Sequence, residues 1–184
     1  KPLWGHCVGL LALAEALKRN PADPRGLRKS VQKGTEYLLS CQSPGKGWGF
    51  GAPGSSDTSA TCWAVLALDA SRRAGIVVPD KAFVGASAWM KEVLDVRNGK
   101  ATFGYDGKNR FVRGVPDSTT AQGMFCQILL GREEGVDGGV RTLLDTKPSG
   151  QADLYCWYFQ THALALLGGA PWTAWRNELG QALL

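Results

Sequence analysis

The segment from Asp153 to Gly169 places the strongest constraint on how this chain folds. It reads DLYCWYFQTHALALLGG, an acidic residue followed by an apolar and aromatic run and then two glycines. Asp153 is suited to cap the start of a helix, and Gly168-Gly169 is suited to end it in a left-handed turn. Such a helix is apolar on nearly every face, so it is stable only when other helices surround it. It is too short to span a membrane.

Composition places the chain among folded globular proteins. Hydrophobic residues make up 44% of the 184 residues and charged residues 20%, which fits one domain over residues 1–184. The chain lacks an initiator Met, so we expect a fragment or part of a longer protein, and the compartment is left open. The odd number and wide spacing of the cysteines predict buried, reduced thiols at Cys7, Cys41, Cys62, Cys126 and Cys156.

Two kinds of helical pattern alternate four times along the chain. Segments starting near residues 4, 57, 117 and 153 are apolar on most faces, and aspartate precedes the last three. Each is followed by a one-sided, amphipathic segment, at 25–41, 81–95, 136–144 and 171–184. Repeated helical hairpins bury their apolar faces only against their neighbours. We therefore predict an all-α fold with inner helices wrapped by outer ones, and no strand.

Several segments resemble proteins of one family. Residues 33–48, KGTEYLLSCQSPGKGW, resemble the aromatic QW repeat of squalene and hopene cyclases, although Lys46 stands where that repeat usually has a glycine. Residues 57–63, 153–159 and 168–177 resemble bacterial proteins with prenyltransferase/squalene-oxidase repeats. The resemblance implies an α/α toroid whose inner helices line an apolar cavity. A full toroid has five or six hairpins, so this chain, with about four, is expected to be an open horseshoe or a truncated ring.

The motifs of the catalytic members are incomplete. Cyclases of this family use an Asp-x-Asp-Asp acid, but the matching place here reads Ser55-Ser56-Asp57-Thr58, and an aspartate before a helix is most simply a cap. The zinc-binding prenyltransferases hold their metal with an aspartate, a cysteine and a histidine, and only Asp57 matches, because Ser59 and Cys156 stand at the other two positions. Asp57 and Cys156 together fall short of the three protein ligands that catalytic zinc needs. Cys7, Cys62 and His162 could form a different site only if their helices face one another. We expect no metal and no other cofactor.

Three functions stay open. The first is a module whose aromatic-lined cavity binds an isoprenoid-like or other apolar small molecule. The second is a protein-interaction scaffold, and the third is a reduced cyclase or prenyltransferase-like enzyme. The candidate catalytic residues are Asp57, Asp153 and His162, and the candidate ligand-binding residues are Trp63, Phe125, Tyr155, Trp157 and Tyr158.

The net charge of +5 is the last feature with a bearing on partners. Its densest run is Lys18, Arg19, Arg25, Arg28, Lys29 and Lys33, on the polar face of a helix. We interpret this run as a solvated helix face rather than a nucleic-acid footprint. No nucleic-acid partner and no transmembrane segment are therefore expected.

Overall fold

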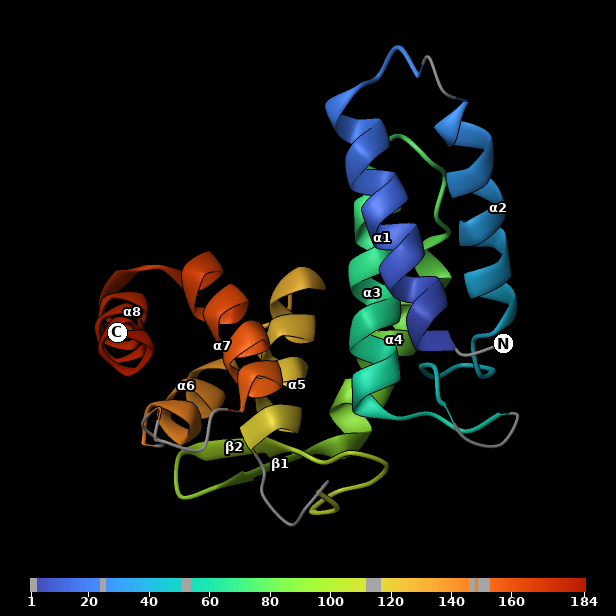
Figure 1. Cartoon of the computed structure of the whole chain (residues 1–184). Coiled ribbons are helices and arrows are strands. Elements are labelled where there is room, and N and C mark those ends of the chain that lie inside the picture. The colour runs from blue at the N-terminus through green and yellow to red at the C-terminus, as the bar shows by residue number, and fades with distance from the viewer. Residues whose placement is uncertain (1–2, 24–25, 51–53, 112–116, 146–147, 149–152) are drawn as a thin grey trace. The chain divides into compact units, whose positions relative to one another are not determined.

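The chain is mostly helical and divides into two compact units (Figure 1). The computed structural model describes residues 3–23, 26–50, 54–111, 117–145, 148 and 153–184, and these contain eight helices and one two-stranded sheet. Unit 1 comprises residues 1–89 and unit 2 residues 90–184. The predicted all-α class is confirmed at the level of helix content. The single domain and the toroidal arrangement stay predictions.

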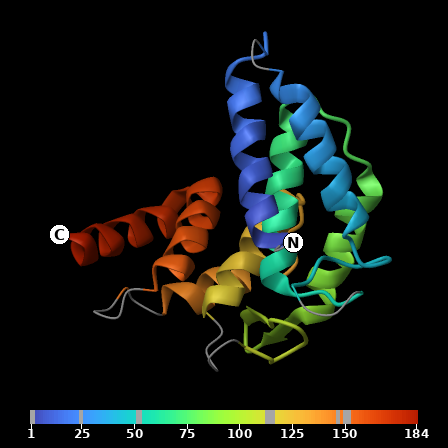
Figure 2. The same ribbon diagram turned by 45° about the vertical axis from the view of Figure 1, so that its right-hand side comes forward.

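Unit 1 is built around a helix that is covered on almost every side. It contains α1 (Leu3–Arg19), α2 (Leu27–Ser40), α3 (Thr58–Arg73) and most of α4 (Asp80–Val93). Helix α1 contacts both α2 and α3, and Figures 1 and 2 show these three helices side by side. In α3 every residue from 60 to 68 is buried, which matches the prediction of a wrapped apolar helix.

A tight turn around Trp48 connects helices of unit 1. The Trp48 side chain is 0% exposed, and its ring N–H donates to the carbonyl of Leu38 at 2.7 Å. Its backbone N–H donates to Thr61 Oγ1 at 2.9 Å, and its carbonyl accepts from the Asp57 N–H at 2.8 Å. A Cβ on Gly47 would lie 2.1 Å from Thr61 Oγ1, so only glycine fits there. We call residues 42–50 the Trp48 turn.

Unit 2 surrounds α5 with a hairpin and further helices. It contains β1 (Leu94–Arg97), β2 (Lys100–Phe103), α5 (Asp117–Leu129), α6 (Val136–Leu144), α7 (Leu154–Leu167) and α8 (Gly169–Leu183). Helix α5 contacts β2, α6 and α7. Helix α8 packs against α7, and Figure 2 shows it extending away from the end of that helix.

The hairpin of β1 and β2 corrects the prediction that the chain has no strand. Leu94 pairs with Phe103 and Arg97 with Lys100, which leaves Asn98 and Gly99 as a two-residue turn. Both turn residues have positive φ, 51° and 74°. Asn-Gly is the preferred pair for such a turn because both of its residues tolerate that conformation. The apolar helical pattern that precedes this stretch favours a helix end followed by a loop, and it hides the hairpin signal.

The predicted helix boundaries agree closely with the structure. The segments expected over 25–41, 81–95, 136–144 and 171–184 are α2, α4, α6 and α8. Asp57 and Asp153 cap α3 and α7 with their side chains, as predicted. Gly168 and Gly169 end α7 with φ of 69° and 62°. The side chain of Asp117, expected to cap α5, lies outside the described residues.

Candidate functional site

The candidate residues fall into both units. Asp57 and Trp63 belong to α3 and its start in unit 1, whereas the other six belong to unit 2. Of these six, Phe125 lies on α5, Asp153 precedes α7, and four lie on α7: Tyr155, Trp157, Tyr158 and His162.

Asp57 is held as a helix cap in the core of unit 1. Its Oδ1 accepts from the Ala60 N–H at 2.7 Å, and its Oδ2 accepts from the Phe50 N–H at 2.9 Å. The residue is buried, and its own N–H donates to the carbonyl of Trp48. Two backbone donors therefore stabilise the carboxylate on both oxygens. The geometry matches the capping interpretation of the sequence.

Trp63 is part of the packing between α1 and α3. The side chain is buried, and its ring meets that of Trp4 edge-on, with centroids 6.2 Å apart and planes at 85°. Edge-to-face contacts of this kind stabilise a fold in addition to the burial of apolar area. Trp4 itself is half-exposed, so it covers Trp63 from the solvent side. The structure places Trp63 in the core of unit 1.

The aromatic candidates of α5 and α7 do come together. Phe125 and His162 have ring centroids 5.7 Å apart, and Tyr158 and His162 are 4.5 Å apart. Phe159 joins them from the core: it is completely buried and lies 5.9 Å from Phe125, 5.2 Å from Tyr155 and 5.0 Å from Tyr158. Sequence reasoning missed Phe159, although its spacing from Tyr155 and His162 could have placed it beside both.

The outer side of this cluster is accessible. Tyr155 and Tyr158 are each 39% exposed, and Leu154 and Leu166 at either end of α7 are 65% and 58% exposed. Residues three or four apart share one side of a helix, so these side chains form a continuous strip. No Lys, Arg, Asp or Glu occurs between Asp153 and Arg176. We define the α7 aromatic face as Leu154, Tyr155, Tyr158, His162 and Leu166.

This exposure differs from the prediction that α7 is wrapped on all sides. In unit 2 the helix rests on α5 and α8, and its buried residues, such as Phe159 and Ala163, lie on one side. Trp157 is half-buried and lies across the helix from Tyr155, because two residues turn a helix by about 200°. The structure therefore separates Trp157 from the aromatic face, although the sequence grouped it with the other α7 candidates.

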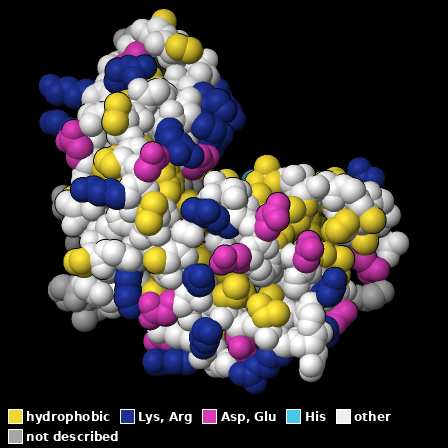
Figure 3. Space-filling model, turned by 180° about the vertical axis from the view of Figure 1, so that it is seen from behind, with side chains coloured by type: hydrophobic (Ala, Val, Ile, Leu, Met, Phe, Trp, Pro, Cys, Tyr) yellow, Lys and Arg dark blue, Asp and Glu magenta, His cyan; other side chains and the backbone are white. Residues whose placement is uncertain are grey.

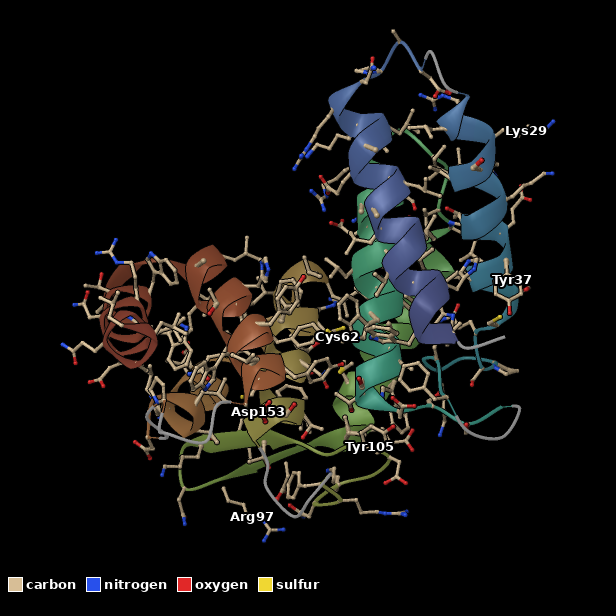
Figure 4. All side chains as sticks on the ribbon, in the orientation of Figure 1. Lys29, Tyr37, Cys62, Arg97, Tyr105 and Asp153 are labelled. Atoms are coloured by element: carbon tan, nitrogen blue, oxygen red, sulfur yellow. The ribbon has the colours of Figure 1, made fainter. Side chains whose placement is uncertain are left out.

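Asp153 and His162 do not form an acid–base pair on α7. Asp153 is exposed at the start of the helix and accepts from the Cys156 N–H at 2.9 Å (Figure 4). His162 lies nine residues on, about 13 Å along the helix axis. The neighbouring rings of Phe125 and Tyr158 remove part of the hydration of the imidazole, which lowers the pKa of His162. At neutral pH this favours an uncharged ring within an apolar face.

Four of the five cysteines are buried, as predicted, whereas Cys41 is half-buried. None of the five forms a disulfide in the structure. Burial, together with the neighbouring Cys41, raises the pKa of Cys7 to about 12, and burial alone raises the pKa of Cys126. Nowhere in the described ranges do three His, Cys, Asp or Glu side chains gather as metal ligands would.

Comparison with known proteins adds no relative. Neither the protein-family models, nor the curated proteins, nor the solved structures contain a match to this chain. Of the helices in the described ranges, none has the length and apolar character needed to cross a membrane. The geometry therefore defines a mostly helical protein with a solvent-accessible aromatic face on α7.

Proposed function

We propose that this chain is a binding module of the α/α-toroid type that holds an isoprenoid-like or other apolar group on the α7 aromatic face. The observation that carries the proposal is the pair of half-exposed tyrosines on a fully buried aromatic floor, on a helix that has no charged residue. Leaving apolar area of this kind in water costs free energy, and an apolar ligand that covers it recovers that free energy.

The few polar atoms of the face suit a ligand with one polar end. They are the hydroxyls of Tyr155 and Tyr158 and the imidazole of His162. Small-molecule sites commonly combine apolar and aromatic walls with a few polar groups that orient the ligand. A long isoprenoid alcohol has this composition, since its chain is apolar and its hydroxyl can bond with a tyrosine or histidine side chain.

A protein-interaction scaffold is the second candidate, and the exposed leucines favour it. Leu154 and Leu166 lie about three turns apart on α7, a length over which an amphipathic partner helix can make several anchoring contacts. The reduced-enzyme alternative has less support, because the carboxylate of Asp57 is bound by backbone donors on both oxygens.

The test is a titration of the purified chain with farnesol, in which the heat of binding is measured by isothermal titration calorimetry. We expect saturable binding with a negative heat-capacity change, and about tenfold weaker binding for the double variant Tyr155→Ala/Tyr158→Ala. The matched control is Tyr37→Ala, which removes a tyrosine of similar exposure, 37%, from unit 1.

Each outcome decides between the candidates. An affinity that falls only in the α7 variant supports the binding module. The absence of farnesol binding, or an equal loss in the Tyr37 control, contradicts it. In that case the unaltered chain, used as bait against amphipathic helical peptides with the same α7 variant as its control, tests the scaffold.

A further inference from the structure

The net charge of the chain is carried entirely by unit 1. Residues 1–89 contain 11 Lys and Arg against 6 Asp and Glu, which accounts for the whole net charge of +5. Residues 90–184 contain ten of each and are neutral. An asymmetry of this kind concerns partners rather than folding.

Most of the excess lies at one end of the unit. The ends of α1 and α3 meet there, since Arg73 forms an ion pair with Glu15 at 3.3 Å. The start of α2 joins them, since Arg28 donates to the Gly75 carbonyl at 3.3 Å. Dark-blue side chains gather over this unit in Figure 3, and Lys29 points into solvent in Figure 4. We define the basic end as the exposed residues Lys18, Arg19, Arg28, Lys29, Arg72 and Arg73.

The nearby carboxylates are already engaged. Asp69 pairs with Arg72 at 3.3 Å and with Arg73 at 2.8 Å. Asp23 caps α2 by accepting from the backbone N–H groups of Leu27 and Arg28. Asp80 and Lys81, at the start of α4, offset one another in charge.

Four of the six cations of the basic end therefore have no carboxylate partner among the described residues, and one of the four, Arg28, is held by the Gly75 carbonyl. Across the part of the chain that the structure describes, none of Lys18, Arg19 and Lys29 forms an ion pair. Their charge faces solvent, where it is available to an anionic partner.

An exposed apolar side chain lies beside two cations of the basic end, Arg28 and Lys29. Val77, in the loop between α3 and α4, is 82% exposed, the largest exposed fraction among the large apolar residues of unit 1 that the structure describes. It borders a hollow of about 490 Å³ whose other walls include Ile76, Arg28, Lys29 and Gln32. Cations around a protruding aliphatic side chain match the boundary between charged lipid headgroups and acyl chains.

We propose that the basic end of unit 1 docks on an anionic lipid surface. Lys18, Arg19 and Lys29 are attracted to the headgroups, and Val77 enters the interface between headgroups and acyl chains. A single-stranded nucleic acid fits this surface less well, because single strands are held by exposed rings on which bases stack. Phe83, the ring that contacts the basic end, is half-buried and lies under the Arg72 guanidinium at 4.5 Å.

The attraction is electrostatic and therefore depends on salt. Each basic residue near an anionic leaflet strengthens binding, and the effect decays within a Debye length of about 8 Å at physiological ionic strength. This docking does not rest on the proposed ligand of the α7 aromatic face, because it uses other residues and another unit.

The test is co-sedimentation of the full chain with vesicles of phosphatidylcholine alone or with about 30% phosphatidylserine. We expect binding only to the anionic vesicles, and weaker binding as salt rises. The variant Lys18→Glu/Arg19→Glu/Lys29→Glu should bind at least about tenfold more weakly. The control Lys108→Glu/Arg132→Glu/Arg176→Glu changes the net charge equally at exposed positions of unit 2 and should bind as the unaltered chain does.

Further variants distinguish lipid docking from simple charge attraction and from loss of folding. Lys18→Gln/Lys29→Gln, which introduces no negative charge, should also weaken binding, and circular dichroism checks that each variant is folded. Val77→Ser should weaken vesicle binding but leave binding to polyglutamate unchanged. Three results would overturn the proposal: binding to neutral vesicles, equal losses in both triple variants, or vesicle binding by the Val77 variant as strong as that of the unaltered chain.

Discussion

Two aromatic regions of this molecule lie in opposite environments. The Trp48 turn is closed, because Trp48 donates both of its N–H groups to protein oxygens and is 0% exposed. The α7 aromatic face is open, with two tyrosines each 39% exposed. Its rings contact other rings, and its buried floor is Phe159.

The two regions differ in whether nearby backbone groups need side chains as hydrogen-bond partners. In the Trp48 turn, loop N–H and carbonyl groups need partners, and Trp48, Asp57 and Thr61 supply them. On α7 the helix already pairs its own backbone groups, so its side chains do not have to. Aromatic residues therefore stabilise the fold in the first region and remain available to a ligand or partner in the second.

The largest expected effect is at Trp48. Trp48→Ala removes a fully buried indole and its hydrogen bond to Leu38, so we expect about 3–5 kcal/mol lower free energy of unfolding. Urea denaturation followed by circular dichroism measures this. The control Trp4→Ala, on a half-exposed ring, should cost about 1 kcal/mol. A similar loss of unfolding free energy in both variants would mean that the enclosed Trp48 side chain stabilises unit 1 no more than the half-exposed Trp4 does.

The second prediction compares neighbouring residues of α7. Phe159→Ala empties the buried floor of the aromatic face and should lower the free energy of unfolding by about 3–4 kcal/mol. Tyr158→Ala, on the exposed side, should cost about 1 kcal/mol, because its ring is already partly in water. The same denaturation experiment applies. If Tyr158→Ala lowered the free energy of unfolding as much as Phe159→Ala, the Tyr158 ring would have to be buried in solution rather than exposed on the α7 aromatic face.

The third prediction concerns the two caps. Asp57→Ala leaves two backbone N–H groups without their acceptor and should cost about 2 kcal/mol. Asp153→Ala removes one bond at an exposed helix start and should cost about 0.5–1 kcal/mol. Melting curves of the two variants rank them. A reversed ranking would contradict the assignment of Asp57 as a buried cap.

The smallest effect is the pH dependence at His162. Because the folded pKa lies below the unfolded one, the folded state binds fewer protons. Stability is therefore fully present above the unfolded pKa of about 6.5 and declines as pH falls through the folded value. NMR titration should give a lower midpoint in native protein than in urea. In the variant His162→Gln, the free energy of unfolding should depend less on pH in this range. If its pH dependence were the same as that of the unaltered chain, His162 would not be desolvated by the rings of the aromatic face.

Much of the fold was predictable because its signals are local. Helix α6 was expected over Val136–Leu144 and has those bounds, since one-sided periodicity and flanking glycines act within a few residues. The caps at Asp57 and Asp153 follow from the same short-range rules. The β-hairpin was also locally encoded in Asn98-Gly99, but the adjoining helix pattern masked it.

The candidate site was predictable only in part. Tyr155, Tyr158, His162 and Phe125 do meet, whereas Trp63 and Asp57 belong to the core of another unit and Trp157 lies across the helix. An all-apolar helix carries no periodic signal that says which side is covered. Only the packing of neighbouring helices decides that.

By itself the sequence determined the helices, their order and the caps of α3 and α7, because backbone propensity and hydrophobic periodicity act over short distances. The tertiary structure decided that Trp48 is enclosed, that Tyr155 and Tyr158 remain accessible, and that the cations of three helices share one end of unit 1. These features depend on contacts between residues distant in sequence, such as Trp48 with Thr61 and Arg73 with Glu15. Which side chains are buried, and which charged side chains lie together on the surface, is decided only when such segments pack together.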